Sequence, residues 1–278
     1  MTLLACLVLA LATPISAGAL EIRFENLHLP AARPLDEGPY SLRSGRFSEA
    51  RWISSVRAEI LNPRSSSARL HFHAGLIPGD PTPYLFDDRP HLLLTDGSPE
   101  WRFPEGYGLP IAAKEKYAAY AKLFGADKAI PAGGVVLYAV LSPKPLKELG
   151  HVVLSASREG ENPEARVDWI RDSHINAQPG RTTRRYPRRF SRSGQVVAAF
   201  AHPARHIARV SLLDAANGKV LLHRGPPWTQ TLAREERFSV DKSAAYVLEV
   251  KIDNPGKAHE RILRPALHLF LSSEAINP

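Results

Sequence analysis

The sequence predicts an all-β protein made of two consecutive antiparallel β-sandwich domains of jelly-roll-like form, with one short helix. Its 278 residues include 24 Pro and 18 Gly spread along the chain, which leaves little room for long helices but ample room for short strands and turns. Residues 246–252 alternate, with one side apolar and the other largely charged, as in a strand with one buried face. A hydrophobic content of 44% suffices for a packed core.

Residues 1–19 have the outline of a secretory signal peptide. They carry no charged side chain, residues 3–12 are almost wholly apolar, and Ala17-Gly18-Ala19 has the small-x-small pattern of a cleavage site. The apolar run is shorter than the roughly 20 residues that a membrane-spanning helix needs. We therefore expect a periplasmic or secreted protein whose mature chain begins at Leu20 and has no transmembrane span.

The strands are expected on both sides of a single helix. The helix is predicted at residues 112–124, where Ala, Lys, Glu and Tyr dominate and Gly125 follows as a stop. An Asn217-Gly218 turn joins two of the strands as a hairpin. The expected strands cover residues 20–27, 51–61, 68–74, 135–141, 151–157, 167–171, 195–202, 207–214, 219–224, 245–252 and 266–272.

The domain boundary is expected in a polar stretch that contains Pro and Gly, at residues 173–184. This boundary gives an N-terminal β-sandwich domain at residues 20–172 and a C-terminal β-sandwich domain at residues 173–278. No internal repeat and no heptad period is visible in either predicted domain.

The chain is basic, with 36 Lys and Arg residues against 28 Asp and Glu residues and a formal net charge of +8. A basic exported protein meets anionic surfaces readily. The sequence has no helix-turn-helix, zinc-finger or aromatic ribonucleoprotein pattern, so we expect no nucleic-acid partner. It also has no Gly-x-Ser-x-Gly elbow and no Walker or dinucleotide Gly loop, which argues against nucleophilic hydrolysis and nucleotide binding.

Any metal site must be built without sulfur, because the only Cys and the only Met belong to the predicted signal peptide. His71 and His73 are the best candidate ligands, since residues at i and i+2 of a strand point to the same face and their rings can converge on one ion. His91 is the nearest candidate for a third ligand. The alternative is that Leu70 and Phe72 face the core while both His residues face solvent.

A second candidate metal pair, His202 and His206, lies in the C-terminal half. Pro203 opposes a helix interior at this point, and a strand would place the two residues roughly 13 Å apart at the usual rise per residue. Only a loop can bring both rings to one ion. The alternative is a sandwich corner that holds no metal.

Residues 181–192, the Arg-rich segment, contain six Arg in twelve positions. Guanidinium groups bind carboxylates, phosphates and sulfates in bidentate fashion, and the aromatic residues of the segment can lie against sugars or bases. A solvated strand edge that is protected by charge would explain the same run without any ligand. The residues predicted to bind an anion are Arg184, Arg185, Arg188 and Arg189.

Four places in the sequence carry a family resemblance. Residues 69–73 read Arg-Leu-His-Phe-His, residues 103–110 contain a Pro-x-Gly-x-Gly turn, and residues 196–202 form an apolar strand that ends in His. The fourth is the order that follows, with a strand, a Gly-containing turn at residues 217–219 and further strands that end at residues 266–271. In this order they resemble the copper type II, ascorbate-dependent monooxygenases, the group of peptidylglycine hydroxylase and dopamine hydroxylase. That resemblance implies two consecutive antiparallel β-sandwich domains with one copper site in each.

The sequence departs from this family at the copper ligands. Pro203 and Ala204 follow His202, so the second His of the family's His-x-His strand is absent. The Met ligand of the family has no counterpart after the signal peptide, and residues 135–141 lack the third His expected there. Oxygen activation by copper requires a firmly held ion with an open coordination position, so we expect the monooxygenase reaction to be lost.

The function expected from the sequence is that of a binding or accessory protein with an unidentified ligand or protein partner outside the cytoplasm, and with at most weak copper binding. One alternative is an active copper monooxygenase with a rearranged site, in which His71, His73 and His91 hold one copper ion and His202 with His206 hold another. The other alternative is a module that binds a polyanion, an anionic surface or a glycan through the Arg-rich segment.

Overall fold

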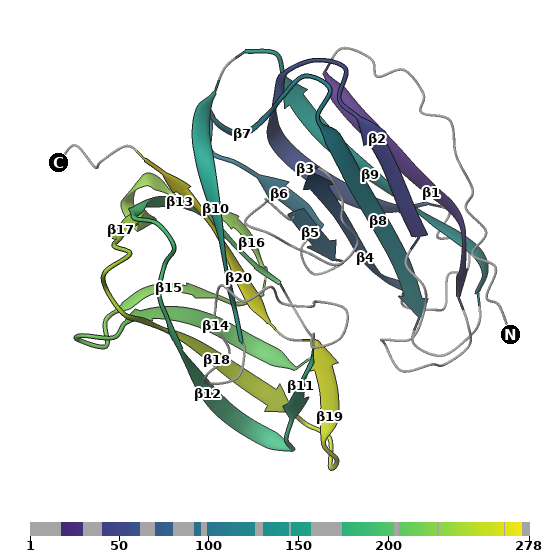
Figure 1. Ribbon diagram of the computed structural model, residues 1–278. Helices are drawn as coiled ribbons and strands as arrows, with labels where there is room; N and C mark the ends of the chain where they lie inside the picture. Colours follow the sequence, from purple (N-terminus) through teal and green to yellow (C-terminus); the bar gives the residue numbers. More distant parts are fainter. Residues whose placement is uncertain are drawn as a thin grey trace, which may run out of the picture.

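The protein is almost entirely β-sheet (Figure 1). The computed structural model describes residues 18–29, 41–61, 70–79, 92–95, 99–125, 130–144, 146–156, 174–202, 206–226, 228–263 and 265–273. Within these residues the one helical element is a 3₁₀ turn, η1 (Arg234–Glu236). The all-β class and the sandwich architecture expected from the sequence are therefore confirmed.

The N-terminal half is a sandwich of two antiparallel layers. One layer has the order β1 (Ala19–Leu29), β9 (Ile130–Ser142), β3 (Arg51–Leu61) and β7 (Tyr107–Ile111), with β6 (Glu100–Arg102) also paired to β3. The other has the order β2 (Ser41–Arg46), β8 (Lys116–Gly125), β4 (Leu70–Pro78) and β5 (Leu92–Thr95). Phe24 and Leu137 of the first layer pack with Leu76 and Leu94 of the second, so the core lies between them.

The C-terminal half is a second sandwich. Its first layer has the order β10 (Lys147–Ser155), β20 (Ala266–Ser272), β13 (Gly194–His202) and β16 (Thr229–Thr231), with β17 (Phe238–Val240) also paired to β13. Its second layer has the order β12 (Gly180–Arg188), β18 (Tyr246–Asn254), β14 (Ile207–Asp214) and β15 (Val220–Arg224). A two-stranded sheet of β11 (His174–Ala177) and β19 (Glu260–Leu263) lies at the end of this sandwich (Figure 1).

The two halves share one continuous ten-stranded sheet. The link is a short parallel pairing of β7 with β10, in which Lys147 lies opposite Tyr107 and Glu148 lies opposite Gly108. Strand β10 precedes the predicted domain boundary in the sequence, yet it pairs along its length with β20 near the end of the chain. Residues 157–173, just before that boundary, lie outside the described residues, and the domain limits stay a prediction.

A buried aromatic cluster, defined by Trp101, Phe103, Phe200, His268 and Phe270, fills the junction between the halves. The ring of Trp101, on β6, stacks on that of Phe200, on β13, at a centroid distance of 4.8 Å. His268 and Phe270, on β20, meet the Trp101 ring edge-on. Phe103 contacts both Phe rings in the same way. Apolar packing as well as backbone pairing therefore joins the two sandwiches.

The helix predicted at residues 112–124 is wrong: a turn covers residues 112–115 and the strand β8 follows. β8 is a central strand, hydrogen-bonded to β2 on one side and to β4 on the other. Tyr117, Ala119, Ala121 and Leu123 alternate into the core. Pairing on both edges and burial of one face outweigh the helix preference of Ala, Lys and Glu, which amounts to less than about 1 kcal/mol per residue.

Most of the predicted strands lie within observed ones. The Asn217-Gly218 turn joins β14 to β15 as predicted, with Gly218 at a φ of +71°. The carboxylate of Asp214 accepts hydrogen bonds from the Ala216 N–H and the Asn217 amide, which holds this turn in place. The strand predicted at residues 167–171 falls outside the described residues.

Candidate functional site

His71 and His73 lie on β4, in the four-stranded layer of the N-terminal sandwich. In the register of the sheet, His71 is opposite Phe124 and His73 is opposite Lys122, both on β8. The two positions are i and i+2 of one strand and so belong to one face of the sheet, as the prediction requires. The third predicted ligand, His91, lies outside the described residues.

His202 and His206 flank residues 203–205, which lie outside the described residues. His202 closes β13 opposite Ala266, whereas His206 lies in the turn before β14 with a φ of +66°. The His206 ring is only 9% exposed, and its Nε2 lies 2.9 Å from Oε2 of Glu260. A carboxylate therefore already contacts one of the two ring nitrogens of His206.

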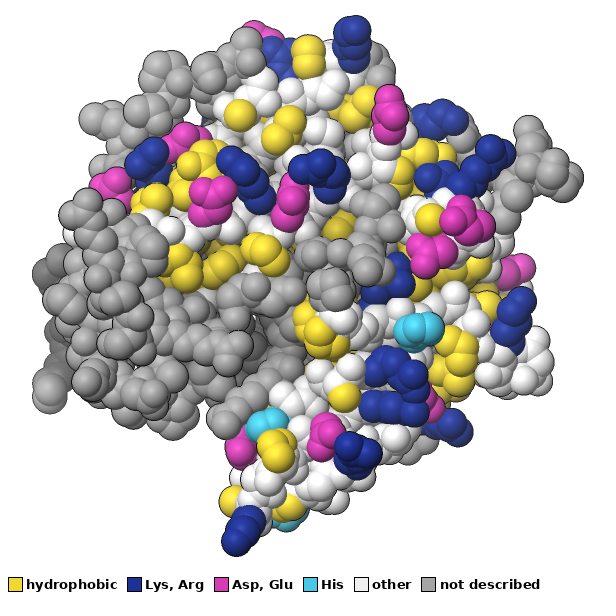
Figure 2. All heavy atoms as spheres, turned by 180° about the vertical axis from the view of Figure 1, so that it is seen from behind, with side chains coloured by type: hydrophobic (Ala, Val, Ile, Leu, Met, Phe, Trp, Pro, Cys, Tyr) yellow, Lys and Arg dark blue, Asp and Glu magenta, His cyan; other side chains and the backbone are white. Residues whose placement is uncertain are grey.

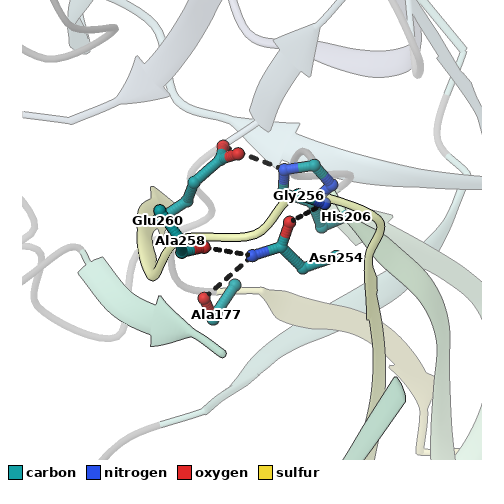
Figure 3. Close-up of polar contacts among 6 residues, drawn as sticks. All are labelled: Ala177, His206, Asn254, Gly256, Ala258 and Glu260. Carbon is teal, nitrogen blue, oxygen red and sulfur yellow. Dashed lines mark hydrogen bonds and ion pairs between the residues drawn. The ribbon is translucent and has the colours of Figure 1, made fainter. Parts of the chain in front are cut away.

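The corner around His206 is held by a buried amide (Figure 3). Asn254 is fully buried, and its Nδ2 donates to the carbonyls of Ala177 and Ala258, each at 3.1 Å. Its Oδ1 accepts from the Gly256 N–H at 2.9 Å. These contacts tie the turn between β18 and β19 to β11 and close the end of the sandwich. The hydrogen bonds of Asn254 therefore have a structural role at this corner.

No metal centre with a full ligand set is present in the part of the chain that the structure describes. These residues contain no group of three or more His, Cys, Asp or Glu side chains that could hold an ion together. A catalytic copper centre needs several protein ligands and an open position. Because His91 lies outside the described residues, the predicted site of His71, His73 and His91 stays a prediction.

The Arg-rich segment forms the edge strand β12 and the turn that follows it. Arg188 is buried and Arg184 is partly buried. Arg184 donates from Nη2 to the carbonyl of Asn176, and Arg188, only 6% exposed, donates from Nε and Nη2 to the carbonyl of Ser155. These two predicted anion-binding residues use their guanidinium groups to tie β12 to neighbouring segments.

Arg185 and Arg189, the other two predicted anion-binding residues, are exposed. The Arg185 side chain is 68% exposed, and its Nε donates to Glu249 on β18 at 2.9 Å. Arg181 and Arg192, within the same segment, are exposed as well. Because β12 is a sheet edge, protection of that edge by charge accounts for part of this pattern.

A cleft of about 670 Å³ lies beside the opposite edge of the same layer, along β15 and the loop that contains η1. The ionic residues that line it are Arg209, Lys219, Arg224, Arg237, Glu235 and Glu236. Figure 2 shows Lys and Arg side chains gathered beside a His on the part of the surface where the C-terminal half lies. Lys and Arg side chains therefore outnumber Glu side chains in the lining of this cleft.

Arg224 is the buried member of this set, with 5% of the residue exposed. Its Nη1 donates to the carbonyl of His223 at 3.0 Å, while Nε and Nη2 have no hydrogen-bond partner within the described chain. Burial lowers the pKa of the guanidinium below its ordinary value, and the nearby charge of Glu236 partly opposes that shift. A buried cation with open donors is costly unless an anion joins it.

The sequence pattern predicted the strand that carries Arg224 but gave no role to this residue. Leu222 and Arg224 occupy positions i and i+2, so Arg224 continues the apolar face of β15. A cation on a core-facing position is the one signal that could have singled it out. The cleft itself depends on the η1 loop, which is close to β15 only in the folded protein.

Comparisons with known proteins assign no function. No family model and no curated protein matches the chain. Among solved structures, the protein is similar to peptide:N-glycanase F, with 10% identity, a TM-score of 0.39 and coverage of 93% of this chain and 97% of that one. It is also similar to the empty top component of cowpea mosaic virus, with 10% identity, a TM-score of 0.39 and coverage of 92% and 89%. A third similarity, to tripeptidyl peptidase 2, has 10% identity, a TM-score of 0.28 and coverage of 94% and 24%.

In the described part of the chain, no helix has the length and apolar character required to cross a membrane.

Proposed function

We propose that the protein is a non-catalytic binding or accessory protein that acts outside the cytoplasm on an anionic surface or glycan. The location rests on the uncharged, apolar leader at residues 1–19. The ligand class rests on the charge of the molecule, since a net charge of +8 draws polyanions at low and moderate salt.

The observation that carries the proposal is the row of exposed Arg side chains along β12 and its following turn. Arg181, Arg185 and Arg189 are exposed at intervals of four residues, which along an extended chain is roughly 13 Å. Glu249 and Asp253, on β18, accept from Arg185 and Arg181 and fix those side chains on the surface. Guanidinium groups held this way keep further N–H donors for sulfate or carboxylate groups.

Retention on heparin resin tests this proposal. We expect the double variant Arg185→Ser/Arg189→Ser to elute at clearly lower salt than the wild-type protein, because two charges of the row are lost. Arg188 stays unchanged, since it is buried against Ser155. The matched control is Arg57→Ser/Arg102→Ser, which removes the same charge from exposed side chains of the N-terminal sandwich.

The comparison between the two double variants decides the outcome. If only the β12 variant elutes early, the row is the binding surface. If both variants shift equally, retention reflects the overall charge and the proposal fails. If neither shifts, the Arg residues serve only to protect the edge of the sheet.

Weak copper binding is a second candidate function, and one observation favours it. His71 and His73 occupy positions of β4 that share one face of the sheet, which is the arrangement of a two-ligand copper site. We expect elemental analysis of protein purified without added metal and without a His tag to find copper that His71→Ala/His73→Ala removes. Oxygen uptake with ascorbate would instead indicate the monooxygenase alternative.

A further inference from the structure

Three guanidinium groups with unsatisfied donors line the same cleft. Within the described residues, the Arg side chains that leave a buried nitrogen without a hydrogen-bond partner are Arg209, Arg224 and Arg237, and all three belong to the cleft beside β15. Buried polar atoms in folded proteins are nearly always satisfied. These three side chains make the cleft the best candidate on the described surface for a ligand that accepts hydrogen bonds.

The unpartnered donors of Arg224, which lie buried at the wall of the cleft, define the shape of that acceptor. Nε and Nη2 form one edge of the planar guanidinium group, and their N–H bonds run parallel to each other. A carboxylate accepts from such an edge through both oxygens, which is the strongest common hydrogen-bond pairing of an Arg side chain. Burial and the Nη1 contact with the carbonyl of His223 fix the orientation of the Arg224 side chain and of this edge.

Arg188 provides an internal comparison. It is as deeply buried as Arg224, and the same edge, Nε and Nη2, donates to the carbonyl of Ser155. The fold thus satisfies one buried guanidinium edge with its own backbone and leaves the other open. Glu236 does not close the gap, because its Oε2 accepts from the Ala233 N–H and no hydrogen bond joins it to Nε or Nη2 of Arg224.

Apart from His223 and the charged residues, the side chains of the cleft wall are apolar. Val220, Leu221, Leu222, Pro226 and Phe238 line it together with the charged residues. Val220 is half exposed, so it offers apolar surface at this edge. A wall of this kind suits a ligand with an anionic head and an apolar or ring-shaped body, because such pockets combine apolar contact with a few fixed polar groups.

We propose that the cleft beside β15 binds an organic carboxylate, with Nε and Nη2 of Arg224 gripping the carboxylate and Arg209 and Arg237 adding positive charge. The site lies at the β15 edge of a layer whose other edge is β12. The proposal is therefore independent of the polyanion-binding role of the Arg-rich segment, and each can fail without the other.

Titration of the isotope-labelled protein with sodium benzoate at constant ionic strength tests the proposal. We expect the Nε–H resonance of Arg224 to shift and saturate in nuclear magnetic resonance spectra. Arg224→Lys keeps the charge but loses the fork, so it should weaken benzoate binding at least about 10-fold, and Arg224→Met should abolish it. The matched control Arg185→Lys lies on β12 and should bind benzoate as the wild-type protein does.

Three results would overturn the proposal: no saturable shift with benzoate, equal affinity in wild-type protein and Arg224→Lys, or equal affinity for sodium sulfate and benzoate. Circular dichroism checks that both Arg224 variants fold. Met removes a buried charge and fills similar space, so we expect this variant to fold even though it does not bind. Heparin retention of Arg224→Lys should equal that of the wild-type protein, which separates this site from the β12 surface.

Discussion

Replacement of Trp101 by Ala tests how strongly the two sandwiches depend on each other. Trp101 belongs to β6 of the N-terminal sandwich and is almost fully buried. Its ring stacks on Phe200 of β13 and meets His268 and Phe270 of β20 edge-on. Truncation therefore opens a cavity at the junction and removes contacts that join one half to the other.

The expected loss in the free energy of unfolding is about 4 kcal/mol. A buried large aromatic side chain keeps about 200 Å² from water, which at about 25 cal/mol per Å² amounts to about 5 kcal/mol as an upper estimate. Truncation of buried Trp or Phe to Ala in other proteins costs about 3–5 kcal/mol. The area value is an upper estimate and lies at the top of this range, so we expect about 4 kcal/mol.

Urea unfolding followed by far-ultraviolet circular dichroism measures this loss. Leu42→Ala is the control, since Leu42 is 63% exposed and should change stability by less than about 0.5 kcal/mol. A double-mutant cycle of Trp101→Leu with Phe200→Leu should give a coupling energy of about 0.5–1.5 kcal/mol. A loss below about 1 kcal/mol for Trp101→Ala, or a coupling energy of zero, would refute the view that this cluster joins the halves.

Two further predictions concern polar groups of the C-terminal sandwich. Asn254→Ala removes two donors and one acceptor from a buried corner. We expect this change to lower the free energy of unfolding by about 2–4 kcal/mol, as measured by urea unfolding. A loss under about 1 kcal/mol would contradict the structural role of this amide. Hydrogen bonds from the N–H and then the hydroxyl of Ser243 hold the pKa of Asp241 below its ordinary value of 3.8. A depressed carboxyl pKa stabilises the fold above pH 3.8, and that stability is lost as the pH falls through the folded-state value. Ser243→Ala should therefore raise the pKa of Asp241 toward 3.8 in a carboxyl-carbon resonance titration and reduce the acid-dependent loss, whereas an unchanged pKa would argue against the hydroxyl contact.

Local patterns predicted the strands well where one face is buried. Tyr246, Leu248, Val250 and Ile252 all point into the core of the C-terminal sandwich, as their alternation indicates. The same pattern expects Glu249 on a wet face, yet Glu249 is buried. Its cross-strand partner on β12 lies over it, and a partner that is 64 residues away in sequence leaves no local signal.

The failed helix and the unpredicted cleft have a common physical origin. Residues 112–124 have a composition that favours a helix in isolation, and only pairing with β2 and β4 makes them a strand. Arg224 lies within a correctly predicted strand, but its open guanidinium edge depends on how the η1 loop meets β15. Both features arise from contacts between distant segments, which sequence periodicity does not report.

The position of β20 determines when the first layer of the C-terminal sandwich can form. This strand lies between β10 and β13, every one of its residues is buried, and it ends at Ser272, near the end of the chain. Until β20 is in place, β10 and β13 each expose an unpaired hydrogen-bonding edge. A variant truncated before residue 266 would therefore expose two unpaired strand edges. We expect it to aggregate or be degraded instead of persisting as a shorter, folded form.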